Sequence, residues 1–193
     1  GIDIWLVDHN LDGTINYSSG WQLFNGVANL TVYWGSTSDA CSNAAIEIVV
    51  ISGTQSDPKS KRYAYDPCAN RQTNNNFSIP DSGSYTSSGR NFFYRTTTIS
   101  VSNIFKGIIA RVIPLYSNTP IAVKGCSETI DPPNASCKDF PSQGKQIKST
   151  GVSGDTTRKV TLFQGYPSLP SEFFQHVLFC AGGSGSCAIR TIQ

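Results

Sequence analysis

The segment DHNLDG near the N-terminus comes closest to a metal-binding motif. Asp8, Asn10 and Asp12 stand at positions 1, 3 and 5 of a calcium loop, and the next residue is the glycine of position 6. Position 12 is Ser19 in place of a bidentate glutamate, so a carboxylate from elsewhere in the fold would have to complete the site. The alternative is a plain turn rich in Asp and Asn side chains. The sequence predicts no other cofactor.

Catalytic motifs are sparse. Of the two histidines, His176 lies in the apolar segment FFQHVLF, which is typical of a structural residue. The chain has no GxSxG nucleophile elbow, and its 13 carboxylates fall mostly in turns without a recognisable catalytic pair. Glycosidase carboxylates can, however, be far apart in sequence. The prediction is a protein that is not an enzyme.

Six cysteines in a chain without methionine favour disulfides and an oxidising compartment. Zinc is disfavoured because no CxxC pair occurs and neither histidine has zinc-ligand spacing to a cysteine pair. The sequence does not fix the connectivity, but the short loops AGGSGS and SETIDPPNAS each lie between two cysteines. Locality thus favours Cys180 with Cys187, Cys126 with Cys137 and, for the remaining two, Cys41 with Cys68.

Composition points to the outside of a cell. Charged residues make up 15% of the chain, below the usual ~25%, and hydroxyl and amide side chains fill the difference. A net charge of +2 selects neither nucleic acid nor an anionic membrane. There is no apolar run long enough to span a bilayer and no signal peptide, so a mature or trimmed extracellular product is expected. Sequons for glycosylation occur at Asn16, Asn29, Asn76 and Asn134.

The aromatic residues allow two interpretations, a sugar-stacking face or a packed core. Because most of them fall on predicted strands at core-compatible spacing, core packing is favoured. A sugar-stacking face would make the chain a carbohydrate-binding module, with calcium as a stabilising ion. The residues concerned are Trp5, Trp21, Tyr33, Trp34, Tyr63, Tyr65, Phe92, Phe93 and Tyr94.

The elements that would position these residues are mostly strands. They are short, rich in β-branched and aromatic residues, and bounded by turn formers. They predict a mainly β fold: antiparallel sheets packed as a sandwich-like domain over residues 1–193, with long loops, one or two short helical turns and a soft boundary near Asn91. Asn70–Arg90 is the most loop-like segment. The predicted strands are Ile2–Val7, Asn29–Gly35, Ala45–Ser52, Lys61–Asp66, Phe92–Val101, Ile108–Tyr116, Ile121–Lys124 and Phe173–Phe179; the helical turns are Val101–Gly107 and Leu169–Gln175.

The stretch KQIKSTGVSGDTTRKVTLF predicts a hairpin. Gln146–Thr150 and Thr156–Phe163 read as its strands, and Gly151 and Gly154 in the connection are free to adopt positive φ. Apolar and polar residues alternate along both strands, which is the pattern of a half-buried antiparallel pair. Arg158 and Lys159 are expected to face solvent.

The sequence of this hairpin resembles that of a hairpin that recurs in the globular heads of type IV pilin-like proteins. Further segments occur in an order similar to that in PilX-like minor pilins and related surface proteins of candidate-phyla bacteria. These segments are LTVYWG (Leu30–Gly35), AIEIVVISG (Ala45–Gly53), RYAYDPC (Arg62–Cys68), NNF (Asn75–Phe77), RVIPLYSNTPIAVKGC (Arg111–Cys126), FPSQG (Phe140–Gly144) and QGYPSLPSEFF (Gln164–Phe174).

The resemblance implies a secreted, disulfide-stapled head with a structural or adhesive role on a pilus or cell surface. Its partners would be other pilus or surface subunits, a host cell or a glycan. The N-terminal hydrophobic helix of pilins is missing from the sequence as given, so either a trimmed head or a free surface module is expected. The contact surfaces would be Asn70–Arg90 and the loops Cys126–Cys137 and Cys180–Cys187.

Overall fold

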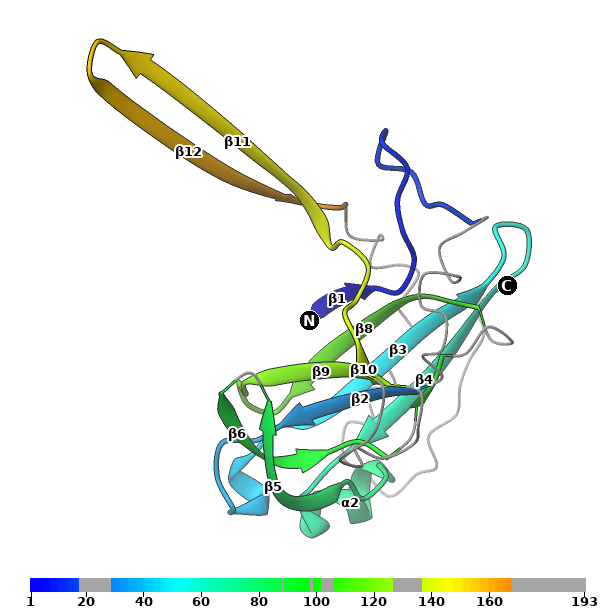
Figure 1. Ribbon diagram of the computed structural model, residues 1–193. Helices are drawn as coiled ribbons and strands as arrows, with labels where there is room; N and C mark the ends of the chain where they lie inside the picture. The colour runs from blue at the N-terminus through cyan, green and yellow to red at the C-terminus, as the bar shows by residue number, and fades with distance from the viewer. Residues whose placement is uncertain (18–28, 88, 98, 102–105, 127–136, 168–193) are drawn as a thin grey trace.

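The computed structural model describes residues 1–17, 29–87, 89–97, 99–101, 106–126 and 137–167 (Figure 1). These residues form antiparallel β-sheets with one short α-helix, so the predicted mainly β fold is confirmed. No helix among them is long and apolar enough to cross a bilayer. The predicted strand Phe173–Phe179 and the predicted helical turn Leu169–Gln175 lie outside the described ranges, as does most of the predicted turn Val101–Gly107.

The first sheet has four strands in the order β1-β8-β3-β4. Its two central strands read as almost continuous apolar runs, because this sheet is covered on both faces. The core on one face includes Ile46 and Ile48, and the cluster on the other face includes Val49 and Ile51. The strands are β1 (Ile2–Trp5), β3 (Ala45–Gly53), β4 (Pro58–Tyr65) and β8 (Gly107–Leu115).

The second sheet has the order β10-β9-β2-β6-β5, and the short strand β7 also pairs with β2. Every residue of β2 is buried. Leu30, Val32 and Trp34 on this strand share one core with Ile46 and Ile48 of the first sheet, which is sandwich-like packing. The strands are β2 (Asn29–Trp34), β5 (Asp81–Ser87), β6 (Arg90–Arg95), β7 (Ile99–Ser100), β9 (Ile121–Cys126) and β10 (Cys137–Lys138).

One prediction about the middle of the chain is wrong. The segment expected to be one long loop, Asn70–Arg90, contains most of helix α2 (Ala69–Asn75) and all of strand β5. The polar sequence of β5 concealed a strand because it lies at the sheet edge and is largely exposed. Asn91, where the sequence allowed a boundary, lies inside β6, which pairs with both β5 and β2.

The predicted single strand Phe92–Val101 is divided into β6 and β7, and both parts pair with β2. The division follows from Thr96, whose backbone N–H donates to the carbonyl of Val32 at 2.9 Å and whose hydroxyl accepts from the backbone N–H of Val32 at 3.1 Å. A buried threonine that uses its side chain in this way replaces part of the regular ladder.

The last two described strands, β11 (Gly144–Ser153) and β12 (Thr156–Gly165), pair only with each other in the described part of the chain. They form a hairpin that projects from the sandwich (Figure 1, gold). The hairpin confirms the predicted element, but the half-buried packing predicted for it is wrong, because every residue from 146 to 165 is exposed. We call residues 144–165 the arm.

Candidate functional site

The segment proposed for calcium forms a tight turn. Asp12 accepts hydrogen bonds from both the backbone N–H and the hydroxyl of Thr14, at 2.9 and 2.7 Å, and these bonds lower the pKa of its carboxyl group. Asn10 donates its side-chain amide to the same hydroxyl at 2.9 Å, and the backbone closes the turn around Gly13. The turn thus engages one carboxylate oxygen of Asp12, Oδ1, locally. Among the described residues, no group of three or more His, Cys, Asp or Glu side chains is arranged to hold a metal ion.

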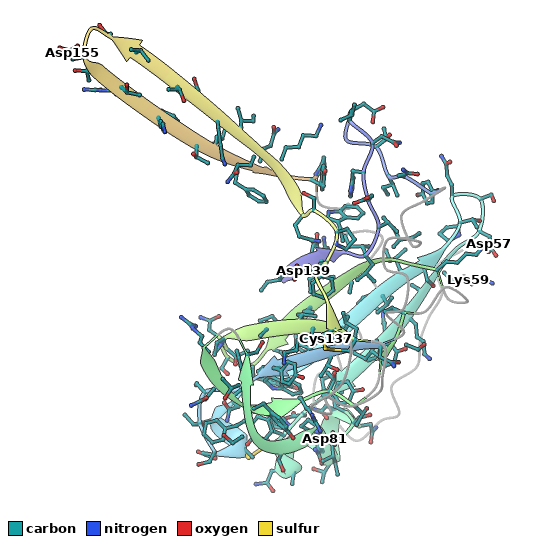
Figure 2. The ribbon with its side chains drawn as sticks, viewed as in Figure 1. Asp57, Lys59, Asp81, Cys137, Asp139 and Asp155 are labelled. Carbon is teal, nitrogen blue, oxygen red and sulfur yellow. A yellow bond between two sulfur atoms is a disulfide. The ribbon has the colours of Figure 1, made fainter. Side chains whose placement is uncertain are left out.

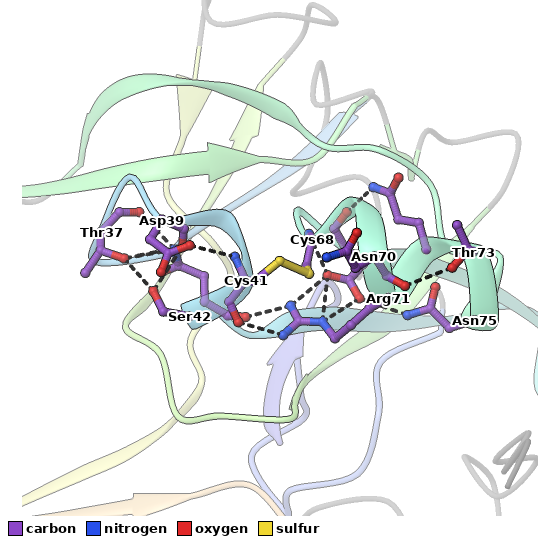
Figure 3. The surroundings of a disulfide bond; sticks show 12 residues. Thr37, Asp39, Cys41, Ser42, Cys68, Asn70, Arg71, Thr73 and Asn75 are labelled. Carbon is purple, nitrogen blue, oxygen red and sulfur yellow. Dashed lines mark hydrogen bonds and ion pairs between the residues drawn. A yellow bond between two sulfur atoms is a disulfide. The ribbon is translucent and has the colours of Figure 1, made fainter. Parts of the chain in front are cut away.

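Two of the three favoured disulfides are present: Cys41–Cys68, with a sequence separation of 27, and Cys126–Cys137, with a separation of 11. The first joins the 3-10 helix η1 (Ala40–Ser42) to the residue that precedes α2 (Figure 3). The second links neighbouring strands β9 and β10, where the two cysteines are directly opposite. Cys180 and Cys187 lie outside the described residues.

A buried carboxylate supports the first disulfide. Asp66 is fully buried and accepts hydrogen bonds from the Arg71 guanidinium (2.7 and 3.0 Å), the backbone N–H of Cys68 (2.9 Å) and the side-chain amide of Asn75 (2.8 Å). These donors satisfy the buried charge, which would otherwise be costly. The pairing raises the pKa of Arg71, and no feature of the sequence had marked Asp66 as its partner.

Arg71 also connects the two segments that the disulfide joins. Its guanidinium donates to the backbone carbonyls of Cys41 at 3.0 Å (Figure 3) and Asn43 at 2.8 Å. The guanidinium carbon also lies over the ring of Tyr116, 4.8 Å from the ring centroid. A guanidinium that binds a carboxylate and two carbonyls at once links the segments that carry them, so Arg71 has a structural role.

The described aromatic candidates are buried or half-buried, as the sequence favoured. Trp5, Trp34 and Tyr33 are each at most 4% exposed. Trp34 packs its ring near Tyr94 and donates its indole N–H to the carbonyl of Ala44 at 3.0 Å. The other aromatic candidates that are described are either buried (Tyr65, Phe92 and Tyr94) or half-buried (Tyr63 and Phe93); Trp21 lies outside the described residues.

The sequons differ in accessibility. Asn29 is 8% exposed at the start of β2, where a glycan has no access. Asn76 is exposed and ends α2 in the left-handed conformation, with φ of 55°. Asn16 is half-buried, and Asn134 lies outside the described residues.

The arm is the largest exposed feature of the described chain. Its strands are joined by the two-residue turn Gly154–Asp155, and positive φ occurs only at Gly154 (56°), as in a type II′ turn. Gly151, the other glycine expected to bend the connection, lies within β11. Figure 2 shows Asp155 at the far end of the arm and Asp139 close to its root.

The two faces of the arm differ. Residues directly opposite in an antiparallel pair point to the same side, so the register places Ile147 and Leu162 together and puts Val160 two positions along the same face. These three side chains, which we call the apolar face, are 50%, 58% and 64% exposed. The other face carries Val152 near the tip and Phe163 near the root. Arg158 and Lys159 are exposed, as predicted.

The root of the arm is held by the N-terminal segment. The side-chain amide of Gln143 donates to the backbone carbonyl of Trp5 at 3.0 Å and accepts from the backbone N–H of Trp5 at 2.7 Å. It thus makes the pair of hydrogen bonds that a neighbouring strand would make. Tyr166 stacks on the His9 ring at a centroid distance of 3.7 Å. The Lys145 ammonium donates to the carbonyl of Leu11. No local pattern in the sequence predicts these long-range contacts, since the partners are more than 130 residues apart.

His9 lies in an unusual position in this root. It contacts the Trp5 ring edge-on at 4.5 Å as well as the Tyr166 ring. Its buried Nδ1 has no hydrogen-bond partner among the described residues. Desolvation lowers the pKa of His9, while the nearby charge of Asp8 opposes this effect and that of Lys145 adds to it. The neutral imidazole therefore fits this site better than the cation.

No known protein family, curated protein or solved structure matches this chain.

Proposed function

We propose that this chain is the head of an extracellular, non-enzymatic surface protein with a structural or adhesive role, of the pilin-like kind that its sequence resembles. The pair of disulfides carries this proposal. Cys41–Cys68 and Cys126–Cys137 are both closed, and disulfides of this kind form and persist in oxidising compartments.

The candidate catalytic and binding residues have structural roles where they are described. Trp5 and Trp34 fill the two cores, Asp66 braces a disulfide, and Asp12 closes a turn. The projecting arm adds an exposed surface that contributes nothing to the sandwich core. A sandwich that carries a protruding arm suits a protein that assembles with other subunits or attaches to a surface.

The test is the location and thiol state of the native protein on intact cells of its source organism. Antibodies against the purified chain should label unpermeabilised cells, and the antigen should appear in the fraction sheared from the surface. Alkylation with a mass-tagged maleimide before reduction should leave Cys41, Cys68, Cys126 and Cys137 unmodified. Antigen detected only after lysis, with these thiols alkylated without reductant, would contradict the proposal.

A further inference from the structure

We infer that the arm pairs with the arm of a second copy of this chain, in an antiparallel two-fold arrangement that covers the apolar face. This inference concerns the purified chain alone and does not depend on the proposed cellular role.

An exposed hairpin of this length requires a partner on physical grounds. Two-stranded sheets are marginally stable in water unless a further strand or a packed face supports them. The described part of the chain supplies neither, since β11 and β12 pair only with each other and every residue from 146 to 165 is exposed. Ten paired positions correspond to an arm of roughly 33 Å, with both strand edges open.

The position of the apolar face favours a copy of the same arm as the partner. Counted from the root, Ile147 and Leu162 form the fourth pair of the ten, and Val160 with Ser149 forms the sixth. The apolar face is therefore centred on the middle of the arm. A two-fold axis through the middle places each apolar face on the other, as an isologous interface requires.

The charges favour the antiparallel sense. The arm carries four basic residues and Asp155, a net charge of +3, so the rest of the chain carries −1. Parallel arms would place like charges side by side along their whole length. In the antiparallel sense, Arg158 near one tip reaches the root of the partner, where the charge of Lys145 acts on Asp12 and the charge of Asp8 acts on His9. There the carboxylates outnumber the ammonium group.

The size of the contact fits a weak, concentration-dependent dimer. A standard specific interface involves about 20–30 residues on each side. Ten residues of the arm lie on the side of the apolar face, and the tip of each arm comes near the partner's N-terminal turn, where Leu11 is 97% exposed. The arm and this turn thus provide an interface at the small end of the range, which corresponds to a weak dimer.

Sedimentation equilibrium of the purified, oxidised chain across micromolar concentrations tests this inference. The wild-type chain should fit a monomer–dimer equilibrium. Val160→Thr should raise the dissociation constant by about tenfold or more, since it removes apolar contact from both halves of the interface. Val152→Thr is the matched control: it makes the same change at a similarly exposed valine on the opposite face, and it should leave the dissociation constant within about twofold.

A second matched pair tests the orientation. Arg158→Glu should weaken the dimer more than Lys159→Glu, because Arg158 shares the apolar face and Lys159 points to the opposite side. Hydrogen exchange provides a readout that does not depend on a variant. The amides of β11 and β12 should exchange quickly in the monomer and become protected at concentrations where the dimer forms.

Three results would overturn the inference. One is a wild-type chain that remains monomeric up to high micromolar concentrations, including a chain whose arm binds some other protein instead. Another is growth beyond the dimer, which indicates docking of the arm onto the body of the next copy. The third is equal sensitivity to Val160→Thr and Val152→Thr.

Discussion

At the scale of single residues, the described side chains of the types used in catalysis or ligand binding have structural roles. Asp66 and Arg71 illustrate this: the carboxylate is fully buried, and its charge is matched by donors from helix α2 and from Cys68, the residue that precedes it. Such a pair is not in itself evidence of high stability, because desolvation offsets much of the attraction. Removing one partner is a different matter, since the other charge is left without compensation.

We expect Asp66→Ala to lower the free energy of unfolding by about 3–5 kcal/mol, because Arg71 then loses its buried counter-ion. Asp57→Ala is the control. Asp57 pairs with Lys59 at 3.4 Å, but both side chains are about 70% exposed, so the expected loss is below about 1 kcal/mol. Urea denaturation of the oxidised proteins measures both values. Equal losses for the two variants would show that Asp66 is no more important than a surface ion pair.

His9 predicts a dependence of stability on pH. Burial lowers its pKa in the folded state below the ordinary 6.5, so the unfolded chain takes up a proton first as the pH falls. The stability contributed by neutral His9 is therefore fully present above pH 6.5 and is lost as the pH decreases through the folded pKa. His9→Phe keeps an aromatic ring against Tyr166 and should flatten the stability profile below pH 6.5. Denaturation midpoints between pH 5 and 8 measure this, and an unchanged slope in His9→Phe would contradict it.

At the scale of elements, the sequence predicted what depends on local pattern. The β-branched run of β3 and the Gly-containing turn of the arm are visible in the sequence, because strand alternation and turn chemistry are local. Strand β5 was missed because an exposed edge strand has no apolar stripe. The disulfide Cys126–Cys137 followed from locality and Cys41–Cys68 was the pair that then remained. The partners of Asp66 and Gln143 could not be assigned, since they are set by tertiary packing.

The two disulfides should contribute unequally. In the chain-entropy account a cross-link stabilises more when it closes a longer loop. The separations of 27 and 11 residues then correspond to about 3.5 kcal/mol for Cys41–Cys68 and about 2.8 kcal/mol for Cys126–Cys137. Paired Cys→Ala variants of each bridge, compared by urea denaturation, test the order. A larger loss on removal of Cys126–Cys137 would show that local packing outweighs loop entropy.

At the scale of the whole molecule, the chain consists of a sandwich and an arm with different energetics. The sandwich has two apolar clusters, one between the sheets and one on the outer face of the first sheet. From Gln146 to Gly165 the arm contributes no residue to either cluster; only Tyr166, beyond β12, packs against the second. Stability of the body and assembly through the arm are therefore separable properties.

This separation predicts the result of shortening the arm. Replacing residues 147–162 by Asn-Gly keeps Gln143, Lys145 and Tyr166, which hold the root, and supplies a two-residue turn. The shortened chain should melt within a few degrees of the full chain at concentrations where both are monomeric, because the two clusters are intact. It should also remain monomeric at concentrations where the full chain dimerises. Thermal denaturation and sedimentation of the same samples measure the two properties together. A large fall in the melting temperature of the monomer would show instead that the arm is part of the folding unit.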